Sequence, residues 1–315
     1  MRAFSPFILA SFILGSLGSF GKRLASYVET SDALLRTVIQ PRRKDSHKGD
    51  NGAVCVIGGS RIFHGAPYFA AMAALRTGTD LVYVAVPNLI AASIRSLAPE
   101  LIVFPVADSK LTMGAANALL KWLPEMDSLV IGPGLGRQSL DGVKKIIGDV
   151  CLERSIRASL DAEAQHTELY SMIREKECIT TPHPGEFKRI FGMEAGDSLE
   201  QKIDSTKEKA SEFGITIVLK GSETVITDGA SVYVNKTGSP AMTCGGIGDT
   251  LSGVIGSLLA QARGTDTKSV EIAAAASYIV GMAGRKAAEI KGFHIISSDI
   301  IEQIPTILKP FDSTV

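Results

Sequence analysis

The chain has 315 residues, of which 45% are hydrophobic and 21% charged, and its formal net charge is +0. This composition is typical of a globular protein with a sizeable core. The balanced charge argues against a nucleic acid or an anionic membrane surface as a partner. The four cysteines are far apart and form no CxxC pair, which favours reduced thiols over a metal site.

The N-terminal 45 residues differ from the rest of the chain. Arg2 precedes an apolar run over residues 7–14, so the first 23 residues resemble a weak signal peptide. The run is too short and glycine-broken for a membrane span, and we expect no stable membrane insertion. An amphipathic lead-in helix and an upstream extension of the true start are the alternatives. We expect an N-terminal extension over 1–45 that ends in a surface lead-in, a folded domain over 46–310, and a cytoplasmic location.

The folded part begins with a strand, a glycine turn, a helix and a second strand. Residues 53–57 form an apolar run, which predicts a strand buried on both faces. A GGS turn at 58–60 precedes a predicted helix over 66–77, and a strand is predicted over 81–86. This order indicates a βαβ unit and a parallel sheet. The turn has neither GxGxxG nor Walker spacing, so a tight turn and a ligand site both stay open.

The same alternation continues through the chain. Strands are predicted over 101–105, 129–131, 157–161, 179–181 and 215–220, and a hairpin over 224–234. Helices are predicted over 113–123 and, rich in alanine, over 272–291. A second glycine-rich turn, GPGLG, follows the strand at 129–131, and open parallel sheets bind ligands beyond the carboxyl ends of their strands. We therefore expect one three-layer α/β/α domain with a mostly parallel central sheet.

A third glycine-rich turn, GGIGD at 245–249, leads into a predicted helix that runs to residue 262. Unpaired N–H groups and the positive dipole end make a helix N-terminus attractive to phosphate. Asp249 stands at this junction, where a carboxylate could take a proton from an attacking hydroxyl. An aspartate that merely caps the helix is the alternative.

Other polar residues follow the predicted strands. Lys220 is suited to neutralise phosphate charge, or is a solvated strand-end lysine. His183 and Glu186 fit a capped turn or a substrate-contacting loop. Asp161 and Glu163 fit water-mediated magnesium binding, or are ordinary loop acids.

The motifs occur in a fixed order along the chain: HKG at 47–49, GGS at 58–60, GAP at 65–67, ALRTG at 74–78, GPGLG at 132–136, TPHPGEF at 181–187 and GGIGD at 245–249. Together they resemble the NAD(P)H-hydrate dehydratase family of the ribokinase-like superfamily, over about residues 46–306. The resemblance implies dehydration of the S-epimer of hydrated NADH or NADPH to the intact cofactor, driven by ATP or ADP. The TPHPGE form is similar to the prokaryotic branch, in which ADP is often the phosphoryl donor.

The resemblance also implies roles for individual residues. Asp249 would be the catalytic base and would contact the substrate, with magnesium bridging the nucleotide phosphates; protein ligands of the metal stay open. The nucleotide would be bound by Lys220, Gly221, Ser222, Glu223, Thr224, Gly245, Gly246 and Gly248. The hydrated dinucleotide would be bound by Ala66, Gly136 and His183.

This chain departs from the family pattern in two motifs. DAE at 161–163 stands where the family usually has a second aspartate, and GSP at 238–240 replaces the common GNP. The 45 leading residues are too few for the epimerase domain that many members carry, so an epimerase would be a separate chain. The alanine-rich helix could form a subunit contact, and we expect a homo-oligomer, with a homotetramer as one form.

Two other functions fit parts of the sequence. A kinase for a thiazole- or pyrimidine-type vitamin precursor would share Asp249 and the anion site, but would not need the GPGLG and TPHPGE loops together. A non-catalytic nucleotide-binding regulator would use the same scaffold, since fold does not determine function. The retained Asp249 counts against the regulator.

Overall fold

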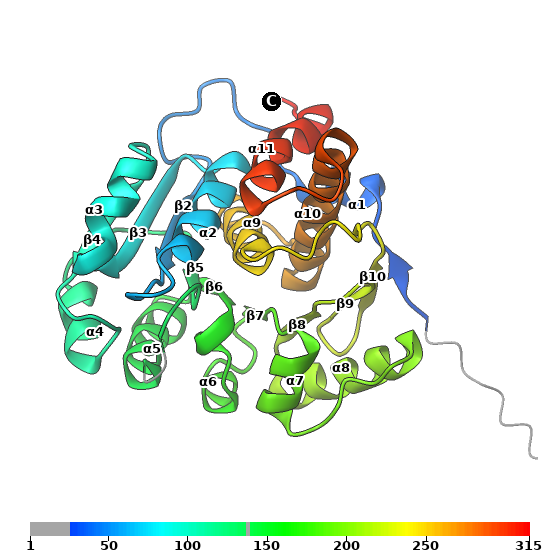
Figure 1. Cartoon of the computed structure of the whole chain (residues 1–315), viewed down its shortest axis with the longest axis horizontal. Helices are drawn as coiled ribbons and strands as arrows, with labels where there is room; N and C mark the ends of the chain where they lie inside the picture. Colours follow the sequence, from blue (N-terminus) through cyan, green and yellow to red (C-terminus); the bar gives the residue numbers. More distant parts are fainter. Residues whose placement is uncertain (1–25, 137–138) are drawn as a thin grey trace, which may run out of the picture.

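The computed structural model describes residues 26–136 and 139–315. The described residues form a ten-stranded sheet in the order β1-β10-β9-β8-β7-β6-β5-β2-β3-β4 (Figure 1). The strands are β1 Val28–Glu29, β2 Ala53–Ile57, β3 Leu81–Pro87, β4 Ile102–Val106, β5 Ser128–Ile131, β6 Arg157–Leu160, β7 Ile179–Thr180, β8 Thr216–Leu219, β9 Thr224–Thr227 and β10 Val232–Asn235. All neighbours from β8 to β4 pair in parallel, whereas β9 is antiparallel to both β8 and β10.

Helices cover both faces of the sheet. One layer contains α1 Asp32–Val38, α2 Gly65–Arg76, α3 Asn88–Leu97, α9 Ile247–Gln261, α10 Ser269–Lys291 and α11 Ser297–Leu308. The other contains α4 Met113–Leu120, α5 Leu140–Ile147, the π-helix Gly148–Glu153, α6 Thr167–Met172, α7 Pro184–Phe191 and α8 Leu199–Phe213. Figure 1 shows the sheet between these two layers, with α4 to α8 along its lower side. The expected three-layer, mostly parallel architecture is therefore confirmed.

The apolar strands explain why the sheet lies inside. Successive side chains of a strand point to opposite faces. Val54 and Val56 of β2 pack in the core under α2 and α3, while Cys55 and Ile57 pack in the core under α4 and α5. A strand buried on both faces needs apolar residues at every position, which accounts for the continuous run at 53–57.

The connections of β2 create a switch point in the sheet. β2 pairs with β3 on one side and with β5 on the other; the chain passes from β2 toward β3, but from β5 it passes in the opposite direction, to β6. Loops that follow β2 and β5 therefore diverge at the carboxyl edge, which is where open α/β sheets leave room for ligands. The turns at 58–60 and 132–136 are these two loops.

The segment expected to precede the domain contributes to it. β1 pairs in parallel with β10, and Leu35 and Val38 of α1 are buried in the core beneath α10. The packing of this segment extends the packed unit to the N-terminal side of residue 46, and so it is more than a surface lead-in. The signal-like segment over 1–23 lies outside the described residues. Among the described residues, no helix is long and apolar enough to cross a membrane.

Candidate active site

The glycine-rich turn at 245–249 starts α9. Gly246 is the residue before the helix, and its φ of 95° lies in the left-handed region that favours glycine. A Cβ there would stand 2.7 Å from Cδ2 of Phe69, so a side chain would clash as well. The cap position belongs to Gly246, and Asp249 lies three residues further on, within the first turn. The interpretation of Asp249 as a plain cap is therefore wrong.

A buried cluster of charges lies beside this turn. Nζ of Lys220 is 3.3 Å from Oδ1 of Asp161 and 3.6 Å from Oε2 of Glu186. Lys220 follows β8, Asp161 follows β6, and Glu186 lies in the first turn of α7, which follows β7. These three strands are neighbours in the sheet and bring the residues together. A Cβ on Gly248 would stand 3.1 Å from Nζ of Lys220, which places the lysine against the first turn of α9.

The cluster changes the acidity of Asp249. Burial is the largest cause, and together with the negative charges of Asp161 and Glu186 it outweighs the Lys220 cation and raises the pKa of Asp249 to about 7. Burial alone would lower the pKa of Lys220, but Asp161 and Glu186 outweigh that effect and raise it. The site therefore holds a permanently charged cation beside a carboxylate that can bind and release a proton near neutral pH.

His183 and Glu186 form a reciprocal cap at the start of α7. Nδ1 of His183 accepts hydrogen bonds from the backbone N–H groups of Gly185 and Glu186, at 3.1 and 3.2 Å. The backbone N–H of His183 donates to Oε2 of Glu186 at 2.9 Å. The capped turn left open by the sequence is therefore present, and the same Glu186 oxygen faces Lys220.

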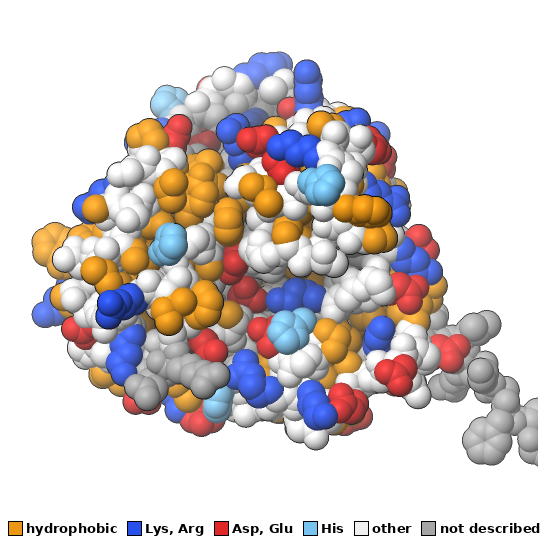
Figure 2. Space-filling view, in the orientation of Figure 1, with side chains coloured by type: hydrophobic (Ala, Val, Ile, Leu, Met, Phe, Trp, Pro, Cys, Tyr) orange, Lys and Arg blue, Asp and Glu red, His pale blue; other side chains and the backbone are white. Residues whose placement is uncertain are grey.

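A cavity of about 850 Å³ opens beside the charge cluster. Six of the residues predicted to bind nucleotide or substrate line it: His183, Lys220, Gly221, Ser222, Thr224 and Gly248. Glu223, Gly245, Gly246 and Asp249 are not part of this lining. Figure 2 shows acidic and basic side chains together in the hollow between the two helix layers.

Sequence reasoning missed the wall formed by α10. Ser277, Val280 and Gly281 line the cavity, although the alanine-rich pattern suggested close packing and a subunit contact rather than a binding site. The one signal was Gly281, a residue that lowers helix stability and is kept where space is short. A Cβ there would stand 1.9 Å from Oγ1 of Thr237.

Gly136 lies in one loop at the switch point, and Ala66 lies in the first turn of α2, directly after the other loop. These loops contact each other, since Cβ of Ser60 lies 3.6 Å from a Cβ built on Gly136. A Cβ on Gly134 would stand 2.9 Å from Cβ of Ala66. Neither Ala66 nor Gly136 lines the 850 Å³ cavity, so the expected substrate residues divide into this pair and the cavity-lining His183.

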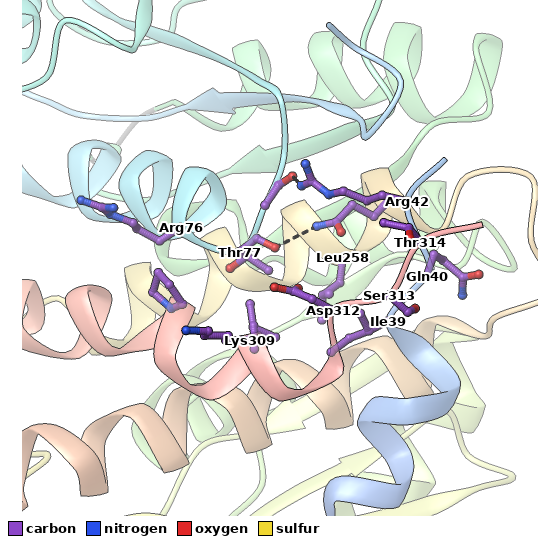
Figure 3. A pocket seen from close by; sticks show the side chains of 14 residues that line it. Ile39, Gln40, Arg42, Arg76, Thr77, Leu258, Lys309, Asp312, Ser313 and Thr314 are labelled. Atoms are coloured by element: carbon purple, nitrogen blue, oxygen red, sulfur yellow. Dashed lines mark hydrogen bonds between the residues drawn. The ribbon is translucent and has the colours of Figure 1, made fainter. Parts of the chain in front are cut away.

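A second cavity, of about 550 Å³, lies at the opposite edge of the sheet (Figure 3). Its polar groups serve the ends of helices there. Gln261 donates to the carbonyl of Thr77 at 3.2 Å, and Arg42 donates to the carbonyl of Gly78. Basic and amide groups at helix C-termini satisfy unpaired carbonyls, which accounts for the positions of Gln261 and Arg42 in this cavity.

Comparison with known proteins decides the family. The family described as NAD(P)H-hydrate dehydratase matches residues 54–306. The ADP-dependent (S)-NAD(P)H-hydrate dehydratase of Nitrosopumilus maritimus is 46% identical over 281 residues, covering 89% of this chain and 96% of the relative. The chain belongs to the NAD(P)H-hydrate dehydratase family.

Two further relatives of this dehydratase family extend the comparison. The bifunctional NAD(P)H-hydrate repair enzyme of Pyrobaculum aerophilum is 37% identical over 86% of this chain and 53% of that relative. The ADP/ATP-dependent NAD(P)H-hydrate dehydratase of Bacillus subtilis, crystallised with ATP and Mg²⁺, has a TM-score of 0.76 and 25% identity, covering 91% of this chain and all of the other. The expected ribokinase-like fold is confirmed. Membership of the dehydratase family also favours that activity over a vitamin-precursor kinase.

The residues present suit magnesium that arrives with a nucleotide. Among the described residues, no group of three or more His, Cys, Asp or Glu side chains is placed to hold a metal ion. Magnesium in nucleotide sites uses one or two carboxylates, with phosphate and water oxygens completing its shell. Glu186, the more exposed of the two carboxylates beside Lys220, offers such an oxygen next to this cavity-lining lysine.

Proposed function

We propose that this protein uses ADP or ATP to dehydrate the S-epimer of hydrated NADH or NADPH and so restores the intact cofactor. The observation that carries the proposal is the carboxylate of Asp249, with its pKa raised to about 7, in the first helical turn beside Lys220 and a nucleotide-sized cavity. This combination supplies a base and a cation at one place, as transfer of a phosphoryl group to a hydroxyl requires.

Asp249 takes the proton of the ring hydroxyl in this mechanism. The hydroxyl oxygen then attacks the terminal phosphorus, and the bond from that phosphorus to the nucleotide's bridging oxygen breaks. The phosphorylated ring loses phosphate as its C–O bond breaks, and a proton leaves the neighbouring ring carbon to form the double bond. Lys220 and the N–H groups at the start of α9 face the negative charge that develops on the phosphoryl oxygens.

The nucleotide occupies the 850 Å³ cavity. Lys220 approaches the phosphates, with Gly248 beside it, and Gly221, Ser222 and Thr224 form one side of the cavity. The glycines at 245 and 246 act through the backbone of the turn that starts α9. Glu186 would help to hold a magnesium ion that arrives with the nucleotide, and the ion would supply additional positive charge near the phosphates.

The hydrated dinucleotide binds across the switch point. Ala66, in the first turn of α2, lies against the loop that contains Gly136, and α2 also contacts the start of α9 through Phe69. This arrangement brings a substrate held by the two loops to the first turn of α9, which carries Asp249. His183 closes the opposite side, between substrate and nucleotide.

We propose ADP as the donor, since the Nitrosopumilus relative at 46% identity is named ADP-dependent. The test mixes the purified protein with hydrated NADH, magnesium and either ADP or ATP, and follows the recovery of reduced-nicotinamide absorbance. Faster recovery with ADP supports both parts of the proposal. Recovery with neither nucleotide, despite tight nucleotide binding, would overturn the dehydratase activity.

Two proposals concern the protein's partners. A homo-oligomer, with a homotetramer as the expected form, is checked by light scattering coupled to size-exclusion chromatography. A separate epimerase chain is the second proposed partner, and it would convert the R-epimer into the S-epimer that this protein repairs. A racemic substrate should then be half consumed by this protein alone within the time in which spontaneous epimerisation is slow.

A further inference from the structure

A chain of buried polar side chains lies behind the Lys220 cluster. It runs from Tyr170 of α6 through Thr180 of β7 and Gln165 to Asp161. The oxygen of Tyr170 is 2.7 Å from Oγ1 of Thr180, which is 3.1 Å from Oε1 of Gln165. Nε2 of Gln165 is 3.4 Å from Oδ1 of Asp161. The side chains of Tyr170, Thr180 and Gln165 are at most 1% exposed, so these bonds are shielded from water.

Hydrogen-bond chemistry determines the direction of the chain. A carboxylate only accepts, so the amide of Gln165 must turn its N–H toward Asp161 and its carbonyl toward Thr180. The hydroxyl of Thr180 must then donate to Gln165, which leaves its lone pair to accept from Tyr170. Burial also raises the pKa of Tyr170, so its hydroxyl keeps its proton. Every donor therefore points toward Asp161.

We propose that Gln165 is a positioning residue of the active site, which, supported by Thr180 and Tyr170, aims the Asp161 carboxylate at Lys220. The same Asp161 oxygen accepts from Oγ1 of Thr181 at 2.7 Å and lies 3.3 Å from Nζ of Lys220. With two donors behind it, the carboxylate cannot swing toward the approaching phosphate. Aligned donors in a buried chain strengthen one another, which stiffens this support.

The backbone at Asp161 also points to a constrained carboxylate. Ala162, the next residue, has a φ of 47°, a left-handed conformation that is costly for a residue with a Cβ. The short helix that begins there carries Gln165 back over Asp161, and the turn closes through the N–H of Ala164 to the carbonyl of Asp161. The strained turn therefore brings Gln165 to the carboxylate four residues before it.

The role of Gln165 rests on the proposed dehydratase function and concerns the placement of Lys220 on the transferred phosphoryl group. Misplacing that cation weakens an interaction that grows as charge develops, so kcat should fall more than KM rises. We expect Gln165→Leu to lower kcat about tenfold, because it removes one hydrogen bond to a charged group. KM for the hydrated cofactor should stay within about twofold, since Ala66 and Gly136 are untouched.

A matched set of threonine variants separates this role from packing. Thr180→Val keeps the shape and removes the hydroxyl, whereas Thr180→Ser keeps the hydroxyl. Thr227→Val is the control: Thr227 is equally buried in β9, and its hydroxyl donates to Ser231 and accepts from Gly229 away from the site. The expected result is a kcat lowered several-fold in Thr180→Val, restored in Thr180→Ser and within about twofold of wild type in Thr227→Val.

Two outcomes would overturn the positioning role. One is a kcat that falls equally in Thr180→Val and Thr227→Val, in proportion to their melting temperatures. The other is wild-type kcat in a folded Gln165→Leu protein. Calorimetric ADP binding tests this role independently of the proposed activity. Even if the wild-type protein shows no turnover, Gln165→Leu should weaken ADP binding several-fold, and Lys220→Met should weaken it more. Unchanged ADP affinity in Gln165→Leu would count against the role.

Discussion

Nζ of Lys220 lies 3.3 Å from Oδ1 of Asp161, a carboxylate whose side chain is 5% exposed. The two residues are 59 positions apart in the chain and meet because β6 and β8 both pair with β7. The pair gives the site a cation that stays charged and an anion that stays in place. Asp249 sits beside both, and its acidity depends on them.

Removing the Lys220 charge should weaken nucleotide binding. We expect Lys220→Met to raise the Kd for ADP by about 10- to 100-fold, the loss of a charge-assisted hydrogen bond to phosphate. Isothermal titration calorimetry measures this directly. Lys209→Met is the matched control, because Lys209 also bridges two carboxylates, Glu208 and Glu212, but lies on α8 away from the cavity. Equal ADP affinity in the two variants would remove Lys220 from the nucleotide site.

Asp249→Asn should abolish the base without changing the shape of the turn. General-base catalysis contributes about 10²- to 10⁴-fold, so kcat should fall by at least about 10². ADP binding should remain, because the backbone of the α9 turn and Lys220 are unchanged. Steady-state rates and calorimetry on one preparation test both halves. A variant that retains most of its turnover would exclude Asp249 as the base.

The rate should depend on the protonation of Asp249. Because burial and its acidic neighbours raise the pKa of this carboxylate to about 7, it is mostly protonated at pH 6 and mostly ionised at pH 8. Only the ionised form accepts a proton, so kcat/KM should fall about tenfold per pH unit below that pKa. The residual activity of Asp249→Asn should lack this limb. If kcat/KM of the variant falls in the same way at low pH, the dependence belongs to protonation of the nucleotide instead.

The raised pKa of Asp249 also predicts that the free energy of unfolding falls as the pH rises, whereas kcat/KM increases. The folded protein holds the Asp249 proton up to about pH 7, whereas the unfolded chain releases it near its ordinary value of 3.8. The folded state therefore binds the extra proton between these values, and the free energy of unfolding falls as the pH rises through this window. The amide in Asp249→Asn does not titrate, so the variant should be more stable than wild type at pH 8 by about 2 kcal/mol, allowing for solvent at the partly exposed carboxylate.

Urea unfolding at pH 4 and pH 8 checks this expectation. The advantage of Asp249→Asn should be present at pH 8 and shrink toward zero near pH 4, where the carboxyl is protonated in both states. A constant difference at the two pH values would mean that the variant acts through packing, and the raised pKa of Asp249 would lose its support.

The contact between α2 and α9 should tolerate no side chain at Gly253. A Cβ there would stand 2.0 Å from the carbonyl oxygen of Ala70. Gly253→Ala should therefore lower the free energy of unfolding by about 1–3 kcal/mol, the cost of overpacking a core. Gly148→Ala is the control, because nothing lies within 4 Å of its Cβ and its φ is helical. Alanine at 148 should be neutral or stabilise slightly; equal losses at the two positions would contradict the tight contact.

Local pattern predicted much of the fold. The short, glycine-bounded apolar run at 53–57 predicted a strand, and the helical spacing of apolar residues after the third glycine turn predicted a helix; both are confirmed. Other helices were missed, among them α8. Its sequence is mostly polar, and only a narrow stripe at Ile203, Thr206 and Ala210 is buried. Too few apolar residues lie in this stripe to indicate a helix without the neighbouring strands.

Within the site, the sequence predicted which residues of each loop have a functional role, but not which residues they contact. GGIGD predicted a phosphate-type turn from local chemistry alone, because backbone freedom and a helix N-terminus are properties of adjacent residues. The sequence left Asp249 as either base or cap, and Lys220 as either functional or solvated. Those alternatives concern charge and burial, which depend on residues brought near by the sheet.

By itself, the sequence determined most of the strands, some of the helices, the glycine turns at the carboxyl ends of strands and the family that these motifs indicate, since all of these depend on neighbouring residues. Only the tertiary structure decided which groups meet. The parallel pairing of β6, β7 and β8 brings Asp161, Glu186 and Lys220 together, and α10 closes the cavity. The acidity of Asp249 follows from that assembly, because electrostatic energy depends on distance and burial rather than on position along the chain.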